Sequence, residues 1–367
     1  MALTNFAALT DEELTIWSRT TWSAARNMQF LNQFVGDGHT AMIQRITELK
    51  KDQKGARAVI TLVKDLEGDG IAGDRTLEGN EEALGMDEQV VQIDQLRHAN
   101  RHEGKMAEQR SVVTFRKESK DKLAYWLSDR MDQMAFLTMS GVSYAYKTNG
   151  PARVGSDLIN LAFAGDVTAP SANRHFQWDA VNGLSPGNTA AVATADTPSW
   201  KMLVEMKALA EESFVKPIRM NNGVAVYNIF MTPTAMSRLK QDADFLANIR
   251  NAAPRSNDNV LFKGAESYYV DGLAIHAYRH VFNTRGLPSG SKWGGGAVDG
   301  CRILMCGAQA MGFADIGAPE WVEKGFDYEN QQGIAYGKIL GYKKPVFYSM
   351  ESGTKEDFGV ICVDVAQ

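Results

Sequence analysis

The chain has 367 residues, of which 44% are hydrophobic and 23% charged, a balance typical of well-packed proteins and not of disordered or fibrous ones. Its 39 basic and 44 acidic side chains give a net charge of −5, which argues against sequence-specific DNA binding through a basic surface. Three cysteines are too few for a disulfide framework, and their odd number favours buried thiols.

Neither the N-terminal segment nor any apolar stretch has the pattern of a signal peptide or a membrane span. The first residues lack a basic region followed by an apolar core, and no stretch reaches 18 apolar residues. We therefore expect synthesis in the cytoplasm and no contact with a membrane.

Residues 1–56 are predicted to form an arm and not a domain. Thr10 followed by Glu13 has the spacing of a capping box, which indicates a helix start. Trp17 and Trp22 follow, but little sequence after them closes a local core. We expect these two aromatic side chains to be buried against other segments or other chains.

Residues 57–64 and 89–97 are predicted to form a pair of antiparallel strands. The 24 residues between them are rich in glycine and in acidic side chains, which predicts a mobile, acidic tip. A two-stranded hairpin is marginally stable alone in water, so this one needs a surface to lie on. The charged tip residues expected to contact a neighbouring subunit are Asp65, Glu67, Asp69, Asp74, Arg75 and Glu78.

Residues 103–139 are predicted to form one long helix. Apolar side chains recur along it at spacings near three and four, and Gly141 is a plausible stop. Such a helix would be roughly 54 Å long. A compact chain of this size has a radius of gyration near ~21 Å, so the helix would cross most of the molecule as a spine.

The remainder mixes helices and strands without a regular alternation, which predicts the α+β class. Residues 150–195 are rich in glycine, proline and alanine and predict loops with little regular structure. Predicted helices are 199–213 and a segment from Thr232-Pro233 through Leu246; predicted strands are 223–231, 268–282 around Asp271-Gly272, 301–306, 334–342 and 358–365.

Two short motifs in the acidic loop are better explained by a loop tip than by a ligand site. Gly68–Gly73 matches the glycine pattern of dinucleotide sites, but no apolar helix follows and nearby carboxylates would repel phosphate. Asp65–Asp69 resembles half of a calcium loop, but the twelfth position is Thr76 where a glutamate is required.

The histidines and cysteines do not form a recognisable site either. His276 and His280 on one strand would lie roughly 13 Å apart, too far to share a metal ion. Cys301 and Cys306 face opposite sides of a strand and are expected to act as small buried side chains. We therefore predict no catalytic residues, no metal and no cofactor.

An arm and a hairpin that cannot bury themselves are typical of an obligate oligomer, in which a neighbour supplies the missing surface. Long blocks of the sequence then give a more specific indication. These are residues 41–84, from AMIQRITELKK to GNEEAL; residues 89–137, from QVVQIDQLRHANRHEGK to MDQMAFL; and the segments GAQAMGFADIG, WVEKGFDYENQQGIAYGKILGYKKPVF and DFGVICVDVA near the C-terminus. Over nearly the whole chain, the sequence resembles the major capsid proteins of tailed bacteriophages, in particular their podovirus-type relatives.

The resemblance implies the tailed-phage major capsid protein fold. Residues 1–56 would then be the N-terminal arm and residues 57–100 the extended E-loop. Residues 101–195 and 333–367 would form the peripheral (P) domain with its spine helix 103–139. Residues 196–332 would form the axial (A) domain.

The resemblance also implies assembly and no catalysis. Copies of the chain would form hexamers and pentamers of an icosahedral shell around double-stranded DNA, each E-loop lying across a neighbouring P domain. Further implied partners are a scaffolding protein and a portal, and possible decoration proteins. The alternative with the same fold is the shell of a cargo-enclosing bacterial nanocompartment.

Overall fold

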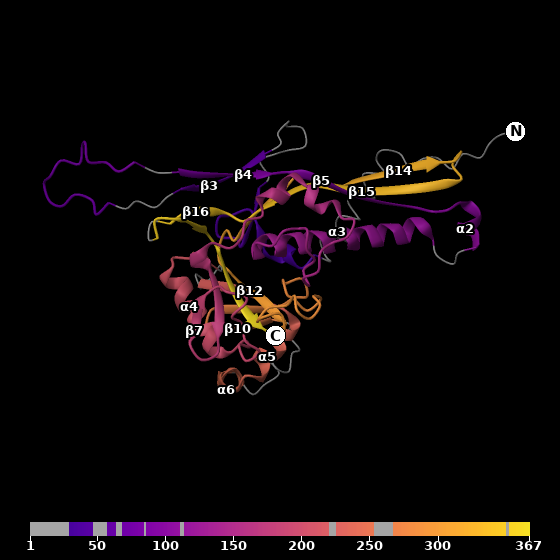
Figure 1. Cartoon of the computed structure of the whole chain (residues 1–367). Helices are drawn as coiled ribbons and strands as arrows, with labels where there is room; N and C mark the ends of the chain where they lie inside the picture. Colours follow the sequence, from indigo (N-terminus) through magenta and orange to yellow (C-terminus); the bar gives the residue numbers. More distant parts are fainter. Residues whose placement is uncertain are drawn as a thin grey trace.

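The computed structural model describes residues 29–46, 57–63, 68–83, 86–110, 114–219, 225–252, 267–349 and 352–367. Figure 1 shows an elongated upper layer, from which a two-stranded ribbon projects at one end and a strand–helix arm at the other. A lobe of strands and short helices lies beneath the middle of this layer (Figure 1). The fold is α+β, as the sequence predicts.

The upper layer is built on a six-stranded sheet whose long central strand is β15. This strand pairs in antiparallel register with three others, so that Gly333 lies opposite Arg101 and Leu340 opposite Asp315. The strands are β1 (Val35–Gly36), β2 (Ile43–Ile46), β5 (Asp94–Arg101), β13 (Met311–Asp315), β14 (Glu320–Phe326) and β15 (Gln331–Lys343).

The lobe is built on an eight-stranded sheet with β12 and β18 at its centre. Every residue of these two strands is buried, and their sequences are continuous apolar runs interrupted only by Arg302 and Asp364. The strands are β6 (His175–Asp179), β7 (Gly183–Pro186), β8 (Ile218–Arg219), β9 (Ala225–Met231), β10 (Ser267–Val270), β11 (Leu273–Ala277), β12 (Gly300–Cys306) and β18 (Val360–Ala366).

The spine helix is α3 (Phe115–Ser140), which packs against β15, β5 and β12 and so connects the two sheets. Residues 131–140 are all buried. The helix ends as predicted: Gly141 adopts φ +66°, its N–H bonds to Thr138 O, and Val142 N–H bonds to Leu137 O. This pair of bonds is the Schellman arrangement.

The prediction of one helix over 103–139 is wrong at its N-terminal end. A separate short helix, α2 (Lys105–Arg110), precedes α3 and runs at an angle to it (Figure 1). Thr114 is extended, with φ −77° and ψ 110°, so helical geometry does not continue through it. The β-branched Thr114 is a poor helix former, which explains why the periodicity alone overestimated the helix.

Other helices begin where the sequence indicates. The hydroxyl of Ser199 accepts a hydrogen bond from Met202 N–H at the start of α4 (Trp200–Glu212). Thr232 accepts one from Ala235 N–H at the start of α5 (Pro233–Gln241). The helix predicted to run through Leu246 instead stops at Asp242, after which α6 (Ala243–Ala252) begins.

The turn between β10 and β11 has positive φ at both central residues, 51° at Asp271 and 74° at Gly272. This is the backbone geometry of a type I′ hairpin, as the Asp-Gly pair predicts.

The predicted hairpin is present as the ribbon, β3 (Arg57–Val63) paired with β4 (Met86–Gln92). Its second strand is shorter than predicted: the segment 89–97 divides after Gln92, and β5 joins the six-stranded sheet. A further two-stranded sheet, β16 (Val346–Tyr348) with β17 (Lys355–Asp357), lies at the ribbon root.

The sheets divide the chain differently from the predicted domain boundaries. Strands β13 and β14, inside the predicted A domain 196–332, belong to the six-stranded sheet. Strands β6, β7 and β18, inside the predicted P domain, belong to the eight-stranded sheet. The stretch 150–195, predicted as loops, contains β6, β7 and the short 3₁₀ helices η2 (Asp157–Asn160), η3 (Ala162–Asp166) and η4 (Ala172–Arg174). The first 3₁₀ helix, η1 (Leu31–Phe34), precedes β1.

Candidate assembly surfaces

The root of the ribbon is anchored by a small apolar cluster of its own. Ala58, Ile60 and Val91 of the ribbon are buried against residues of three other elements. These partners are Ile46, Ala314 and Phe347. Gly312 makes the approach possible, because a Cβ there would lie 2.2 Å from the terminal methyl of Ile60.

Polar contacts fix the direction in which the ribbon leaves the body. The side chain of Gln89 bonds to the backbone of Val346 in both directions, as donor and as acceptor. Lys343 Nζ donates to Val90 O at 2.8 Å, and Gln92 N–H donates to Asp166 Oδ2 at 3.2 Å. These polar contacts hold the ribbon at its root through β4.

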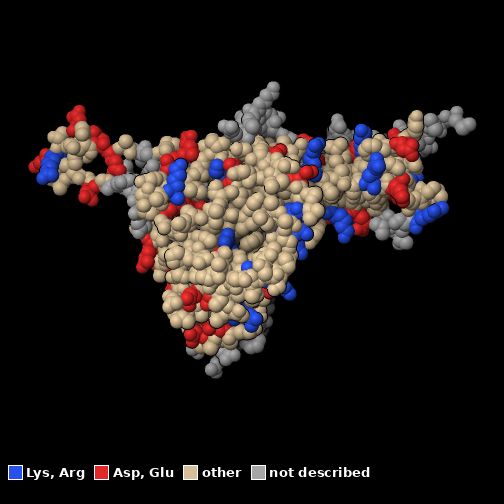
Figure 2. All heavy atoms as spheres, in the orientation of Figure 1, with Lys and Arg blue, Asp and Glu red and all other residues tan. Residues whose placement is uncertain are grey.

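The tip of the ribbon, residues 68–83, projects far from the rest of the molecule (Figure 1). All of it except Ile71 is exposed, including Leu77 at 62%. Glu82 accepts a hydrogen bond from Gly68 N–H at 2.7 Å and Glu81 one from Gly79 N–H at 2.8 Å, so these two carboxylates shape the loop. Figure 2 shows the resulting acidic end of the ribbon with one basic group on it.

Four of the predicted contact residues lie in this tip: Asp69, Asp74, Arg75 and Glu78 are all exposed there. The other four, Trp17, Trp22, Asp65 and Glu67, lie outside the described residues. Their role in contacts between subunits stays a prediction.

A groove of about 660 Å³ opens between β5, α3 and the segment 147–161. Its lining contains four basic side chains, which are Arg97, Arg130, Lys147 and Arg153. Only one acidic side chain, Asp157, lines it as well. We refer to it below as the cationic groove. Sequence analysis did not identify it, because its basic residues come from three separate segments.

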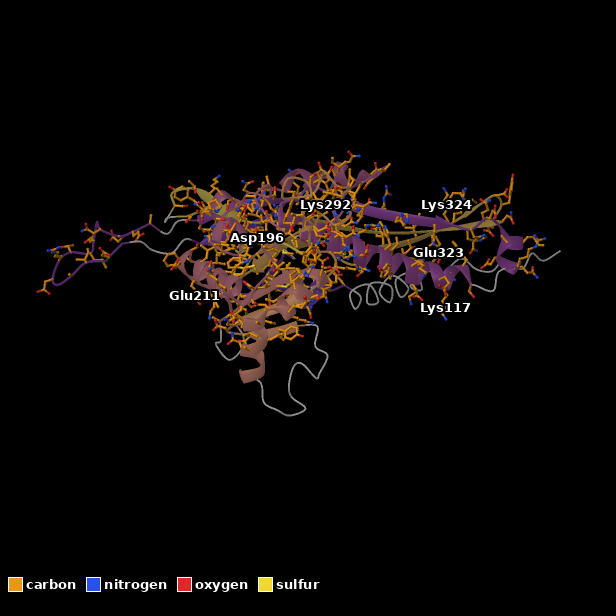
Figure 3. The ribbon with its side chains drawn as sticks, turned by 60° about the horizontal axis from the view of Figure 1, so that its bottom comes forward. Lys117, Asp196, Glu211, Lys292, Glu323 and Lys324 are labelled. Atoms are coloured by element: carbon orange, nitrogen blue, oxygen red, sulfur yellow. The ribbon has the colours of Figure 1, made fainter. Side chains whose placement is uncertain are left out.

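The distal arm, formed by β14, β15, α2 and the start of α3, is braced by one bidentate ion pair. Arg116 of α3 donates to both carboxylate oxygens of Glu323 on β14, at 3.0 and 3.1 Å. Figure 3 shows Lys117 and Lys324 on this arm as well, whereas Glu211 lies on the lobe.

The turn that ends the distal arm has an unusual backbone. Asp327, Tyr328 and Glu329 all have positive φ, between 51° and 64°, and Tyr328 is fully exposed. Strain of this kind concentrates at functional sites, so the turn is a candidate contact. The sequence signal would have been the loop Asp-Tyr-Glu-Asn between two strands.

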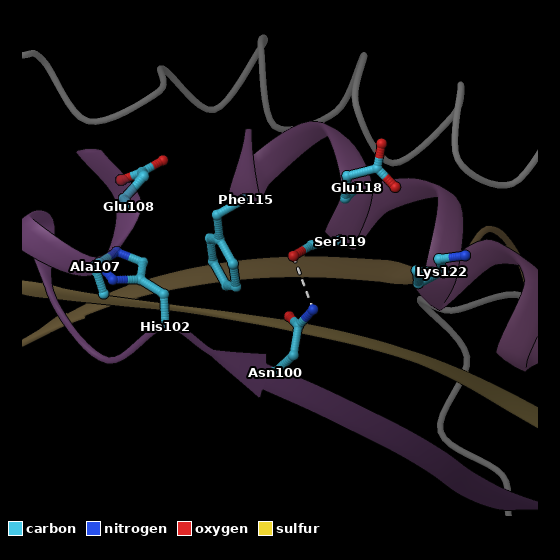
Figure 4. Close-up of a pocket in the computed structure, with 8 residues that line it drawn as sticks. All are labelled: Asn100, His102, Ala107, Glu108, Phe115, Glu118, Ser119 and Lys122. Atoms are coloured by element: carbon cyan, nitrogen blue, oxygen red, sulfur yellow. Dashed lines mark hydrogen bonds between the residues drawn. The ribbon is translucent and has the colours of Figure 1, made fainter. Parts of the chain in front are cut away.

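A second hollow, of about 320 Å³, lies where α3 begins and is shown in Figure 4. Asn100 Nδ2 donates to Ser119 Oγ at 2.8 Å across it, and the ring of His102 packs edge-on against Phe115 at 4.9 Å. Gln332 N–H donates to His102 Nε2 at 3.0 Å. The first two contacts tie β5 and the residue after it to α3, and the third ties His102 to β15.

The lobe is braced by a buried ionic cluster between its central strands and the spine. Arg302 donates to both oxygens of Asp364, at 2.7 and 3.0 Å, and to Ser140 O at the end of α3. His175 Nε2 lies 2.7 Å from Asp364 Oδ2. Burial alone would raise the pKa of Asp364, but the charge of Arg302 and the contact with His175 hold it below its ordinary value.

The segment 29–46 is attached to the spine through one carboxylate. Asp132 accepts hydrogen bonds from Phe30 N–H at 3.0 Å, from Leu31 N–H at 3.3 Å and from the hydroxyl of Tyr278 at 2.7 Å. Burial raises the pKa of Asp132, and the three hydrogen bonds counteract that shift. The ring of Phe30 also stacks on Tyr278 at 4.1 Å.

The cysteines are core residues, as predicted, and so is His280. His276 is partly buried, whereas His39 and His98 are exposed, so the prediction of core histidines is wrong for those two. Burial among aromatic rings lowers the pKa of His276 to about 4, and His280 Nε2 lies 2.8 Å from Asp129 Oδ1. Cys301, Cys306 and Cys362 are free and buried, and burial raises the pKa of the Cys301 thiol to about 11.

Within the described residues, no group of three His, Cys, Asp or Glu side chains is placed to hold a metal ion. Nor does any described helix have the length and apolarity needed to cross a bilayer.

Comparison with known proteins identifies the family. A family model described as phage capsid protein matches residues 5–367. The major capsid protein of Pseudomonas phage KPP25 is 56% identical over 367 residues, covering 99% of this chain and 97% of that one. The chain belongs to the phage major capsid protein family.

Solved capsid structures agree with this membership. The capsid of Ralstonia phage GP4 superposes with a TM-score of 0.74 at 25% identity, covering 92% of this chain and 91% of that one. The capsid asymmetric unit of cyanophage Pam1 gives a TM-score of 0.71 at 18% identity, covering 100% and 96%. The resemblance stated from the sequence is thus confirmed, and a capsid protein associates with copies of itself. The ribbon, the groove and the distal turn are the candidate surfaces for that association.

Proposed function

We propose that copies of this chain form the hexamers and pentamers of an icosahedral phage head that encloses double-stranded DNA. The observation that carries the proposal is the ribbon. It buries apolar side chains only at its root, while its tip reaches away from its own chain with nearly every residue exposed. A two-stranded ribbon of this kind is marginal in water unless another surface covers it.

In the proposed shell each ribbon acts as the E-loop and lies across the body of a neighbouring subunit. The net charge of −5 supports an enclosing wall that does not bind DNA tightly. Many modest contacts, shared among several neighbours, would stabilise the shell against the pressure of packaged DNA. The role is structural and includes no chemical step.

The proposed partners beyond the chain itself are a scaffolding protein and a portal during assembly, and decoration proteins on the finished head. The proposed domain roles are those of the sequence prediction, with N-terminal arm, E-loop, P domain and A domain. The sheet boundaries favour placing residues 311–326 with the P domain, because β13 and β14 pair there.

Electron microscopy of the purified protein, expressed with and without its neighbouring phage genes, tests the proposal. We expect closed shells tens of nanometres across, and a requirement for a neighbouring gene would identify the scaffold. Only monomers or small oligomers under every condition would contradict the proposal. A non-phage cargo enzyme encoded beside the gene and enclosed in the shells would instead favour the nanocompartment alternative.

A further inference from the structure

The cationic groove has more basic than acidic side chains in its lining, four against one. Arg130 Nη1 and Arg153 Nη2 both donate to the same atom, Gln133 Oε1, each at 2.7 Å. The carboxylate that pairs with Arg130, Asp129, is shared with Arg279 and His280. Burial lowers the pKa of Arg153, the neighbouring charge of Arg130 lowers it further, and the charge of Asp129 opposes both effects.

Apolar side chains lie exposed on the same segment that lines the groove. Val154 is 96% exposed and Ile159 53%, and Tyr146, whose carbonyl accepts a bond from Arg153 Nε, is 47% exposed. Apolar groups gathered beside an excess of cations mark a surface that a partner covers. The chemistry that fits is an acidic segment with at least one apolar side chain.

The described tip of the ribbon has this composition. It contains five carboxylates and one arginine within 16 residues, and its Leu77 is exposed. Two of the carboxylates shape the loop, which leaves Asp69, Asp74 and Glu78 pointing to solvent without a side-chain bond among the described residues. The tip lies at the far end of the ribbon, away from α3 and β5 of its own chain (Figure 1).

We propose that the cationic groove of one subunit receives the acidic tip of the ribbon of a second copy, with Leu77 against Val154. This inference rests on the proposed function and adds the receiving surface to it. Charge complementarity fixes the register of the ribbon on its neighbour, and the apolar contact excludes water from the charged pairs. The apolar rim favours a protein segment over DNA, since protein–DNA interfaces are more polar.

Charge reversal in both directions tests the proposal. The groove variant is Arg97→Glu with Lys147→Glu, the tip variant is Asp74→Lys with Glu78→Lys, and the third protein carries all four changes. Each pair alone is expected to weaken subunit association by about tenfold, the sum expected for two exposed charge pairs. The protein with all four substitutions is expected to recover most of the lost association. Arg238→Glu, a reversal on the exposed face of α5, is the matched control and should assemble as the wild type does.

The readout is the yield of closed shells by sedimentation and microscopy at fixed protein concentration, with circular dichroism checking that each subunit is folded. A groove variant that assembles normally would overturn the proposal. So would a protein with all four substitutions whose shell yield is no higher than that of either double variant. So would groove variants that form normal shells but fail to retain DNA, which would make DNA the occupant. Failure of the wild type to form shells would count against the proposed function itself.

A crosslink gives an independent readout that does not depend on charge. Leu77→Cys combined with Val154→Cys should give a ladder of disulfide-linked subunits when assembled shells are oxidised with copper–phenanthroline. Leu77→Cys with Val181→Cys is the control, because Val181 is 81% exposed but lies on the lobe between β6 and β7. A ladder of equal strength in the control, or none in the test pair, would contradict the contact.

Discussion

The eight-stranded sheet and the ribbon are both made of β-strands, but they bury their side chains in opposite ways. Strands β12 and β18 are buried along their whole length, and their one charged pair is enclosed within the fold. The ribbon is buried on one face near its root and exposed at its tip. The lobe is therefore buried by contacts within the chain, whereas the proposed shell would have to supply the contacts that cover the tip of the ribbon.

This difference separates two free energies, that of folding one subunit and that of associating subunits. Substitutions in the lobe should change the unfolding of an isolated subunit. Substitutions in the ribbon should change assembly and leave the unfolding transition nearly intact, because a locally detached ribbon leaves the rest of the fold in place.

The largest effect is expected from Asp364→Ala, which leaves Arg302 buried without its partner. Breaking a buried ion pair by removing one side costs about 3–5 kcal/mol. We expect the free energy of unfolding of the unassembled subunit to fall by that amount in urea titrations. Replacing both residues by apolar ones, Arg302→Met with Asp364→Leu, should cost less than the single change, and an equal or larger loss would argue against the ion pair as the cause.

The ion pair of Arg302 with Asp364 also predicts how the stability of the fold changes with pH. The pKa of Asp364 is lower in the folded protein than its ordinary value of 3.8, so the carboxylate stabilises the fold at pH values above about 4. That contribution is lost as the pH falls through the folded pKa. The Arg302→Met, Asp364→Leu protein should lack this part of the acid transition.

A matched pair of isoleucines compares the two regions directly. Ile303 of β12 is fully buried and Ile60 of the ribbon is 2% exposed. Ile303→Ala should lower the free energy of unfolding by about 2–5 kcal/mol, the usual cost of such a truncation. Ile60→Ala should shift the unfolding midpoint far less but reduce shell yield. Equal shifts for the two variants would mean that the ribbon root folds as one unit with the lobe.

His276 predicts a smaller, pH-dependent effect. Its pKa falls from 6.5 to about 4 in the fold because the ring is buried against Phe30, Phe34 and Phe230. Between those pH values the unfolded chain binds a proton that the folded chain does not, so stability falls as the pH is lowered. At pH 5 the loss should be about 1–2 kcal/mol. His276→Phe should reduce the difference between urea unfolding at pH 7.5 and pH 5, and an unchanged difference would exclude this histidine as its source.

Local sequence signals predicted where helices and turns begin and end. They predicted less well which strands pair with one another in a sheet. Gly141, Ser199, Thr232 and Asp271-Gly272 each determine a cap or turn through their own backbone or hydroxyl, and the structure has them where expected. Strands β13 and β14 were not predicted. Their pairing with β2 and β15 is long-range, and GAQAMGFADIG has the composition of a loop.

The candidate surfaces show the same limit, that the sequence does not reveal which distant segments pack together. The acidic tip is one continuous stretch of sequence, so its charge was visible from composition. The cationic groove joins residues near 97, 130 and 150, which only the packing of β5 on α3 brings together. The hydrogen bonds of Arg130 and Arg153 to Gln133 and the ion pair of Arg130 with Asp129 also depend on that packing. Charge that is spread over three segments is not distinguishable from ordinary surface charge in the sequence.

The smallest effect on the subunit is expected from neutralising the solvent-facing acids of the tip, with Asp69→Asn, Asp74→Asn and Glu78→Gln in one protein. These side chains are exposed and far from the folded body, so the urea midpoint should not move. Assembly should slow at low ionic strength, because the tip no longer attracts a basic surface. At about 1 M salt the Debye length is only about 3 Å, so the variant and the wild type should then assemble at similar rates. Light scattering during assembly across a salt series measures this convergence. A constant difference between the two proteins at all salt concentrations would mean that the tip acts through shape and apolar contact, and not through its charge.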